Sequence, residues 1–488
     1  MTHRAALRAP RALHALRALR ALAWLALAGS TASASADDGG LKVSRRLAPS
    51  SLAQELNLQP GRPLPVAPAS TQPLELNEAV RQAVARHPSI SDAISTLAQQ
   101  AGGVDVARAG YYPQVRVGVG GGSSNAPASQ GGSTGTVATA SVSQMLYDFG
   151  KVDGAVAQSE ALVRRQQAGI LKQIDTVAQQ AADAVVTAHR YQALLAIAQE
   201  QVQAVEKVLE TARLRANAGI STRADPIQAE SRVDSARANL LQVKSQLAQW
   251  RERLGTLLGP GVPPQIAPLP SSLSDGLAGT FRADGPPDTS LLPDVLAAEA
   301  ERRAASAQLE IARANRYPTL SVDASVNKAM GGINPATLER NGTYHTVMLN
   351  LTSVIYQGGA LDAQVRAASA AEEAARMRIE TARLNAGDQA RNFREQVIGA
   401  QARLGVLADR RRSIVEARDL YREQYTLGTR SILDLLNAEQ EIYQAAAEQE
   451  AVLHDLWASR VGYIGATGQA RAFYGLDNTT VQGMELLP

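Results

Sequence analysis

Ala107-Arg-Ala-Gly-Tyr-Tyr-Pro113 and Ala312-Arg-Ala-Asn-Arg-Tyr-Pro318 are two versions of one motif, separated by 205 positions in a chain of 488 residues. Farther along, Tyr147-Asp-Phe-Gly150 matches Tyr356-Gln-Gly-Gly359 at an offset of 209. The same offset relates three further pairs, namely Gly219 and Gly428, Asp225 and Asp434, and Glu230 and Glu439. Similarity at a fixed offset indicates internal duplication. The sequence therefore predicts two copies of one structural plan.

The duplication divides the chain into two repeats with other segments around them. We assign the first structural repeat to residues 74–258 and the second to residues 291–468. The segments outside the repeats are rich in Pro, Ser and Gly or lack periodicity, which is typical of linkers and surface loops. We interpret them as a flexible N-terminal segment, an inter-repeat linker and a C-terminal tail, at 37–73, 259–290 and 469–488.

Residues 1–36 have the three parts of a secretory signal peptide. Five arginines precede an apolar stretch at 21–28, and the small residues after it end in an Ala-Ser-Ala cleavage sequence at Ala36. The apolar stretch is far shorter than the ~20 residues that a membrane-spanning helix needs. Without the signal peptide the chain has 44 basic and 46 acidic groups, so its formal charge changes from +3 to −2. An exported chain without a basic excess is not expected to bind nucleic acid.

Each repeat has apolar residues at every seventh position, a period that is typical of long packed helices. In the first repeat the series runs from Val156 to Ala212, and no proline occurs between Lys151 and Asn217. This pattern predicts one helix of ~65 residues, about 100 Å long at 1.5 Å per residue. In the second repeat the series runs from Val365 to Tyr421.

Short turns follow these long helices, at 218–222 and 427–431, and an apolar period then continues into a returning helix. Each repeat is therefore predicted to contain a helical hairpin. A further helix is expected before each Tyr-Pro motif, at 74–109 and 291–315.

After each Tyr-Pro motif the apolar period becomes two, which indicates β-strands. The predicted strands lie near 114–121, 136–147, 319–328 and 343–356. In all four, one face is apolar: Val115, Val117, Val119, Ala138, Ala140, Val142, Leu146, Leu320, Val322, Ala324, Val326, Val347, Leu349, Leu351 and Ile355. The alternation and a length of about 10 residues suit transmembrane barrel strands, although two soluble hairpins would show the same pattern.

Four strands cannot close a barrel, and lipid does not tolerate an open sheet edge. Several copies of the chain must then share one barrel, and the sequence allows a dimer with eight strands or a trimer with twelve.

The sequence shows no constellation of residues for catalysis or metal binding. Gly131-Gly-Ser-Thr-Gly135 fits G-x-S-x-G, but it lies in a Gly- and Ser-rich loop rather than between a strand and a helix. The histidines after the signal peptide are scattered, without metal-ligand spacing: His87, His189, His345 and His454. Because the chain has no cysteine, disulfides and thiolate metal sites are excluded. We predict no catalytic residue, no cofactor and no metal, and we do not expect an enzyme.

Together with the Tyr-Pro and Tyr147-Asp-Phe-Gly150 motifs, the run Tyr425-Thr-Leu-Gly-Thr-Arg-Ser-Ile-Leu-Asp-Leu-Leu-Asn-Ala438 resembles the TolC family of outer-membrane export channels. The resemblance covers nearly all of the mature chain. It implies a mainly α fold with a small β-barrel portion, in which a homotrimer forms a twelve-stranded barrel in outer-membrane lipid. Long coiled-coil hairpins would continue the barrel as a tunnel through the periplasm. The family's channels are passive conduits, recruited by an inner-membrane pump and a periplasmic adaptor, the membrane fusion protein.

The resemblance also implies a gate at the periplasmic entrance, closed by links between neighbouring hairpins and lined by acidic residues. Carried over by motif, Tyr425 and Arg430 would link toward Asp225, and Asp434 would supply the acidic ring. Asn437 stands where the family often has a second Asp, so the entrance should be less negative. The alternative is that these are ordinary solvated charges at helix ends. The expected adaptor contacts are the turn residues Gly219, Ile220, Gly428 and Thr429.

Within the family, the run from Leu427 to Glu439 and the Tyr147-Asp-Phe-Gly150 motif look most like members that serve type I secretion. The resemblance then implies export of a protein such as an RTX toxin or adhesin, driven by an ABC transporter. The alternative is multidrug efflux, with a drug pump as partner and small molecules as substrates. A periplasmic coiled-coil adaptor is a further alternative, which the paired amphipathic strands disfavour.

Overall fold

The computed structural model describes residues 73–124, 133–259, 265–269, 273, 291–331, 342–477, 479–482 and 484–485. The predicted signal peptide, nearly all of the N-terminal segment and most of the inter-repeat linker lie outside these residues. The described residues are mainly helical, with a four-stranded sheet and a two-stranded one, so the predicted fold class is confirmed. None of their helices is long and apolar enough to cross a membrane.

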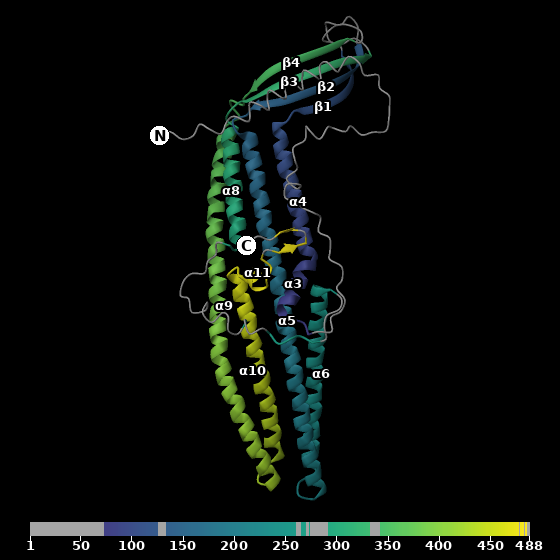
Figure 1. Ribbon diagram of the computed structural model, residues 1–488, viewed down its shortest axis with the longest axis vertical. Coiled ribbons are helices and arrows are strands. Elements are labelled where there is room, and N and C mark those ends of the chain that lie inside the picture. The colour runs from purple at the N-terminus through teal and green to yellow at the C-terminus, as the bar shows by residue number, and fades with distance from the viewer. Residues whose placement is uncertain are drawn as a thin grey trace, which may run out of the picture. The chain divides into compact units, whose positions relative to one another are not determined.

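The chain divides into two compact units. The described part of the first unit lies within Ala98–Arg164 and Ala300–Arg376. That of the second lies within Leu58–Leu97, Arg165–Glu299 and Met377–Pro488. The first unit contains the four-stranded sheet with the helix segments next to it, and the second contains the helical hairpins (Figure 1).

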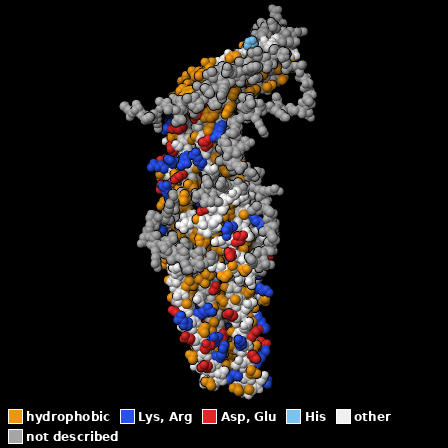
Figure 2. Space-filling model, in the orientation of Figure 1, with side chains coloured by type: hydrophobic (Ala, Val, Ile, Leu, Met, Phe, Trp, Pro, Cys, Tyr) orange, Lys and Arg blue, Asp and Glu red, His pale blue; other side chains and the backbone are white. Residues whose placement is uncertain are grey.

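The sheet of the first unit is antiparallel, in the order β1-β2-β3-β4. Its strands are β1 (Gln114–Ser124), β2 (Ser133–Tyr147), β3 (Thr319–Gly331) and β4 (Thr343–Thr352). Val117 lies opposite Ala140, which in turn lies opposite Val326, so the apolar residues of adjacent strands share one face. This face is open, with Val117 80% exposed, and Figure 2 shows hydrophobic side chains gathered over the sheet. Among the described strands, β1 and β4 each pair along one edge only.

Three details of the strands differ from the prediction. β4 ends at Thr352 instead of continuing to residue 356. Thr352 pairs with Thr319, the first residue of β3, and Pro318 before it has no N–H to extend the pairing. A register shift after Met145 places Tyr147, rather than Leu146, opposite Leu320 on the apolar face.

The third detail concerns the G-x-S-x-G sequence that was expected in a loop. β2 begins at Ser133, so residues 133–135 pair with the end of β1. Residues 131 and 132 of this sequence lie outside the described residues. The strand continues beyond residue 135, whereas a nucleophile elbow requires a helix there.

The helices follow the predicted periodicity closely. They are α3 (Leu76–Arg86), α4 (Pro88–Arg108), α5 (Lys151–Asn217), α6 (Ala224–Leu258), α8 (Pro293–Ala314), α9 (Ala360–Leu427), α10 (Ile432–Ala466) and α11 (Ala470–Phe473), with a short 3-10 helix at Ala109–Tyr111. The single helix expected at 74–109 is interrupted at His87, whose backbone is extended. The break arises because a residue before proline, here Pro88, is excluded sterically from helical geometry.

The hairpins of the second unit contain a close approach between α9 and α10. A Cβ placed on Gly462 would lie 2.4 Å from the Phe393 ring, which is shorter than any real carbon contact. Glycine at position 462 therefore sets the distance between these two helices.

We expect Gly462→Ala to lower the free energy of unfolding by about 1–3 kcal/mol, because the added methyl group overpacks the contact with Phe393. Gly399→Ala on α9 is the matched control, since nothing lies within 4 Å of its Cβ. The control should be neutral or more stable by up to about 1 kcal/mol, through better helix propensity. Urea unfolding of both variants checks this, and equal midpoints would contradict the expectation.

The described part of the C-terminal segment packs against the helices. After α11 it forms a strand pair, β5 (Thr480–Val481) with β6 (Met484–Glu485), and the Tyr474 side chain is buried. The Arg471 guanidinium lies 2.6 Å from the Asp175 carboxylate. Burial raises the pKa of Asp175 to about 6, although the positive charge of Arg471 acts against the rise. Buried apolar and aromatic residues that follow no simple period hold this segment in place.

Candidate functional site

The two helical hairpins share a hydrophobic core near their tips. This tip core draws residues from α5, α6, α9 and α10: Val205, Val208, Leu209, Ala212, Ala229, Val233, Tyr425, Ile432, Leu435 and Leu436. Val205 and Ala212 belong to the seven-residue series that predicted the long helix. At the tips, these residues of the series pack in a core shared with the other three helices. The tips are the place where all five predicted gate residues lie.

The turns at the two tips have the same backbone conformation. Gly219 and Gly428 adopt positive φ angles of 70° and 81°, which glycine reaches without a steric penalty. The N–H of Ile220 donates to the carbonyl of Arg215, and the N–H of Thr429 donates to the carbonyl of Gln424, each at 2.9 Å. Each of these hydrogen bonds joins residues five positions apart, as in a Schellman motif, so α5 and α9 end in the same way. All four residues expected to contact an adaptor are exposed on these turns.

Tyr425 lies beside an arginine that the sequence did not single out. Arg215 of α5 donates from Nη1 to the carbonyl oxygen of Thr426 at 2.6 Å, and its guanidinium carbon lies 4.9 Å from the centre of the Tyr425 ring. Tyr425 is only 3% exposed, and burial followed by the charge of Asp225 raises the pKa of its phenol, which Arg215 opposes. Arg215 thus joins α5 to α9, and the duplication gives no signal for it, because its counterpart is Gln424.

Arg430, which lies just before α10, pairs with Asp434 in the first turn of that helix. The Nε of Arg430 lies 3.2 Å from Oδ2 of Asp434. The guanidinium carbon of Arg430 lies 4.0 Å from the centre of the Tyr421 ring. Asp225 accepts a hydrogen bond of 2.8 Å from the Thr222 hydroxyl. Among the ion pairs of the described protomer, none joins Arg430 to Asp225. The structure therefore groups Tyr425 with Asp225, and Arg430 with Asp434.

Asn437 takes part in a second connection between the hairpins. Its Oδ1 accepts a hydrogen bond of 3.2 Å from Nη2 of Arg232 on α6. An aspartate at this position would make the same contact an ion pair, so the amide weakens the connection as well as the local negative charge.

A buried carboxylate lies two residues after Asn437 on α10. Glu439 is 3% exposed, and its Oε1 lies 3.1 Å from Arg418 and 3.4 Å from Arg422. The duplicated pair in the first repeat, Glu230 with Arg213, also lies at 3.4 Å, but both side chains are more than half exposed. The sequence matched Glu230 with Glu439 and could not show that only one of them is buried.

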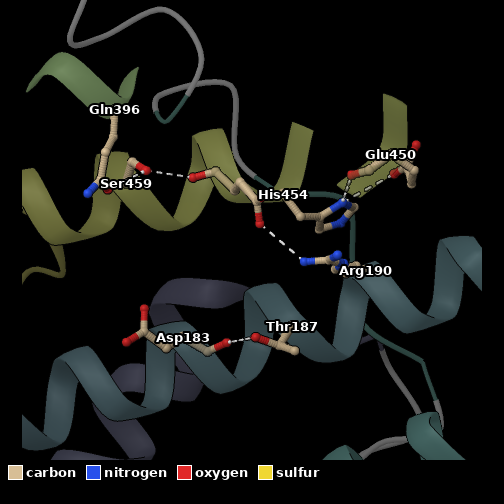
Figure 3. A network of polar contacts seen from close by, with 8 residues as sticks. Asp183, Thr187, Arg190, Gln396, Glu450, His454 and Ser459 are labelled. Carbon is tan, nitrogen blue, oxygen red and sulfur yellow. Dashed lines mark hydrogen bonds and ion pairs between the residues drawn. The ribbon is translucent and has the colours of Figure 1, made fainter. Parts of the chain in front are cut away.

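On α5 and α10 the structure brings together two of the histidines that are scattered in the sequence, His189 and His454. Figure 3 shows His454 with its partner Glu450. His454 Nδ1 lies 2.8 Å from the carbonyl oxygen of Glu450, and its Nε2 lies 2.8 Å from His189 Nδ1. Because a carbonyl only accepts, His454 Nδ1 carries a hydrogen. In a neutral His454, Nε2 then accepts from His189 Nδ1. Among the described residues, no three His, Cys, Asp or Glu side chains form a metal-binding group.

The surroundings of His454 favour its neutral form. Burial lowers the pKa of His454 to about 4, with smaller contributions from His189 and Arg190, and burial also lowers the pKa of His189. Arg190 is paired with Asp455 at 3.1 Å. Burial raises the pKa of the nearby carboxyl groups, Glu450 and Asp183, with Arg411 opposing the rise at Glu450.

We expect His454→Gln to make the free energy of unfolding depend less on pH. In the natural protein the unfolded chain binds a proton at His454 below its ordinary pKa near 6.5, whereas the folded chain does not until about pH 4. Stability is therefore lost as pH falls through this window, by about 2 kcal/mol between pH 7 and pH 5. The raised pKa values of Glu450 and Asp183 act in the opposite direction, and subtracting the profile of the variant removes their contribution. Urea unfolding at pH 7 and pH 5 checks this, and parallel profiles would contradict it.

Comparison with known proteins agrees with this architecture. The family described as "Outer membrane efflux protein" matches residues 79–260 and 291–469. Outer membrane efflux protein BepC of Brucella suis is 24% identical over 376 residues, which cover 76% of this chain and 80% of BepC. The toluene efflux pump outer membrane protein TtgC of Pseudomonas putida is 28% identical over 72% of this chain and 73% of its own length. The crystal structure of VceC from Vibrio cholerae shares the fold, with a TM-score of 0.68 at 20% identity over 80% of this chain and 96% of VceC.

Proposed function

The chain belongs to the outer membrane efflux protein family, and from this premise we propose that it is the exit channel of a pump that exports small molecules. The family-level part of the resemblance to TolC channels is thereby established: the protein is an outer-membrane channel of a tripartite system. Channels of this family are trimers that work with a periplasmic adaptor and an inner-membrane pump, and the family is one of passive conduits. The cargo and the gate are the parts that we propose.

Small molecules are favoured as cargo by the names of the relatives. TtgC is named for efflux of toluene, and BepC is named an efflux protein. Both are similar to this chain over more than 70% of its length.

Type I secretion of a protein such as an RTX toxin is the second candidate. It is favoured by the sequence from Leu427 to Glu439 together with Tyr147-Asp-Phe-Gly150, which resembles members that work with an ABC transporter.

A deletion strain distinguishes the two cargoes. For small-molecule export we expect the strain to become sensitive to toxic organic compounds while its extracellular protein pattern stays unchanged. Loss of one large secreted protein with unchanged sensitivity would support type I secretion instead. Complementation with the natural gene is the control for both measurements.

For the gate, we propose that the hairpin tips close the periplasmic entrance. Arg215 and Arg232 connect the two hairpins of one protomer, so each protomer's tips form one body. Tyr425 would link toward Asp225 of its own protomer and Arg430 toward Asp225 of a neighbouring copy, with Asp434 supplying negative charge and Asn437 reducing it. The pair of Arg430 with Asp434 is partly exposed, and such pairs contribute only ~0–1 kcal/mol, so adaptor binding could rearrange it. The adaptor would contact the exposed turns at Gly219, Ile220, Gly428 and Thr429.

A further inference from the structure

One residue of the first unit has a backbone conformation that does not suit its side chain. Phe149 has a φ angle of 60°, in the left-handed region. The duplicated position in the second repeat is Gly358, whose φ angle is 58°. Both repeats therefore make the same turn, and only the second uses the residue that makes it without strain. A residue with a Cβ costs roughly 1–2 kcal/mol in this conformation, so the phenylalanine needs another explanation.

The turn itself does not need the Phe149 ring. Asp148 accepts hydrogen bonds from the N–H groups of Gly150 at 3.0 Å and Val152 at 2.7 Å, and so it caps the first turn of α5. The Phe149 side chain is not part of a core either, because 43% of it is exposed. Burial and capping thus give no reason to keep an aromatic residue at this position.

The ring belongs to an exposed aromatic cluster that consists of Tyr147, Phe149 and Tyr317. The Phe149 and Tyr317 rings are stacked with centres 5.2 Å apart, and Tyr147 meets the edge of Phe149 at 4.7 Å. All three side chains are exposed to a similar extent. Of the three residues, only Phe149 lacks an aromatic counterpart in the other repeat. Tyr147 corresponds to Tyr356, and Tyr317 corresponds to Tyr112.

The aromatic cluster lies where the apolar sheet face ends and the charged helices begin. Tyr147 is paired with Leu320, which is in turn opposite the exposed Leu351. On the other side, Lys151 donates to the carbonyl oxygen of Tyr317 at 2.9 Å and to the Thr319 hydroxyl at 2.8 Å. From the interior of a membrane to water, the side chains of a membrane protein change from apolar to aromatic to charged, and aromatic side chains are enriched at the interface.

We propose that Phe149 is a membrane-interface anchor that places its ring, with Tyr147 and Tyr317, among the phospholipid headgroups at the periplasmic surface of the outer membrane. The strained backbone is retained because this turn presents the ring outward, in continuity with the apolar sheet face. A trimer then has three such anchors, one from each first repeat, because Gly358 supplies none.

The location of residue 149 can be measured directly, because the natural chain has no cysteine. A nitroxide label is attached at Phe149→Cys, and at two controls: Glu210→Cys on the exposed surface of α5 and Val117→Cys on the apolar sheet face. The full-length mature trimer is placed in vesicles of phosphatidylethanolamine and phosphatidylglycerol. We expect the 149 label to be less accessible to a water-soluble nickel complex than the 210 label, and more accessible than the 117 label. Accessibility equal to that of the 210 label would overturn the proposal, as would shielding that arises only when lipopolysaccharide is added.

A second experiment tests whether the ring matters. Phe149→Gly removes the ring and relieves the strain, whereas Phe149→Trp keeps a ring that prefers the interface. We expect a smaller fraction of Phe149→Gly trimers to remain in the vesicles after an alkaline urea wash, with Phe149→Trp retained like the natural protein. Retention of Phe149→Gly at the natural level would overturn the proposal. So would a loss of folded trimer for Phe149→Gly in detergent, since the ring would then act through packing on Tyr317.

Discussion

Glu439→Gln should lower the free energy of unfolding by about 3 kcal/mol per protomer, the largest stability loss that we expect from a single substitution here. Glu439 is 3% exposed and lies between Arg418 and Arg422, and Arg418 is itself mostly buried. Removing the negative charge leaves the mostly buried guanidinium of Arg418 with only the exposed Asp419 as counter-ion, at 2.7 Å. Breaking a buried pair costs about 3–5 kcal/mol. The amide of glutamine can still accept one hydrogen bond, which places the expected loss at the lower end. Urea unfolding of the trimer at neutral pH measures it.

The duplication provides a matched control for this substitution. Glu230→Gln makes the same change at the corresponding position, where Glu230 and Arg213 are both more than half exposed. Exposed ion pairs contribute ~0–1 kcal/mol, so the free energy of unfolding of this variant should be close to that of the natural protein. If both variants lose the same stability, burial of Glu439 is not the cause.

The combined variant Arg430→Ala with Tyr425→Phe should raise the single-channel conductance of the protein in a planar lipid bilayer. Under the proposed gate, Arg430 links to Asp225 of a neighbouring copy and Tyr425 links to Asp225 of its own protomer, so the loss of both links lets the entrance widen. The phenol is removed without its ring, which keeps the packing of Tyr425 in the tip core.

Arg412→Ala is the control for the change in charge. Arg412 is on α9, pairs with Asp409 at 3.2 Å, and is 70% exposed, so its removal alters net charge equally without touching the tip core. We expect the conductance of this control to match that of the natural protein. An unchanged conductance in the combined variant would reject the gate assignment, and the residues would then be ordinary solvated charges at helix ends.

The long helices and the sheet are predictable from sequence because their signals are local and repeated. The seven-residue series between Val156 and Ala212 requires only neighbouring turns of one helix, and α5 begins and ends at the predicted residues Lys151 and Asn217. The two-residue alternation in β1 and β4 likewise follows from the pleat of a single strand. The break at His87 has a local signal too, because the proline that follows it disfavours helical geometry at that residue.

The candidate site was predictable only in part. Gly219 and Gly428 could be placed on turns because a positive φ angle favours glycine, whatever surrounds it. Arg215 could not be identified, because its role depends on the carbonyl of Thr426, which lies 211 positions away. Arg232 with Asn437 is a second contact of this kind, formed between helices from different repeats.

By itself, then, the sequence determined the duplication, the helical hairpins, the amphipathic strands and the family, since each is expressed in periods and motifs along the chain. The tertiary structure alone decided which equivalent residues differ in environment. Glu230 and Glu439 match in sequence, yet only Glu439 is buried, and it meets Arg418 where the first repeat has Leu209. His189 and His454 are 265 positions apart and become hydrogen-bond partners only when α5 packs on α10. Burial and charge pairing depend on which helices come together, and no local pattern contains that information.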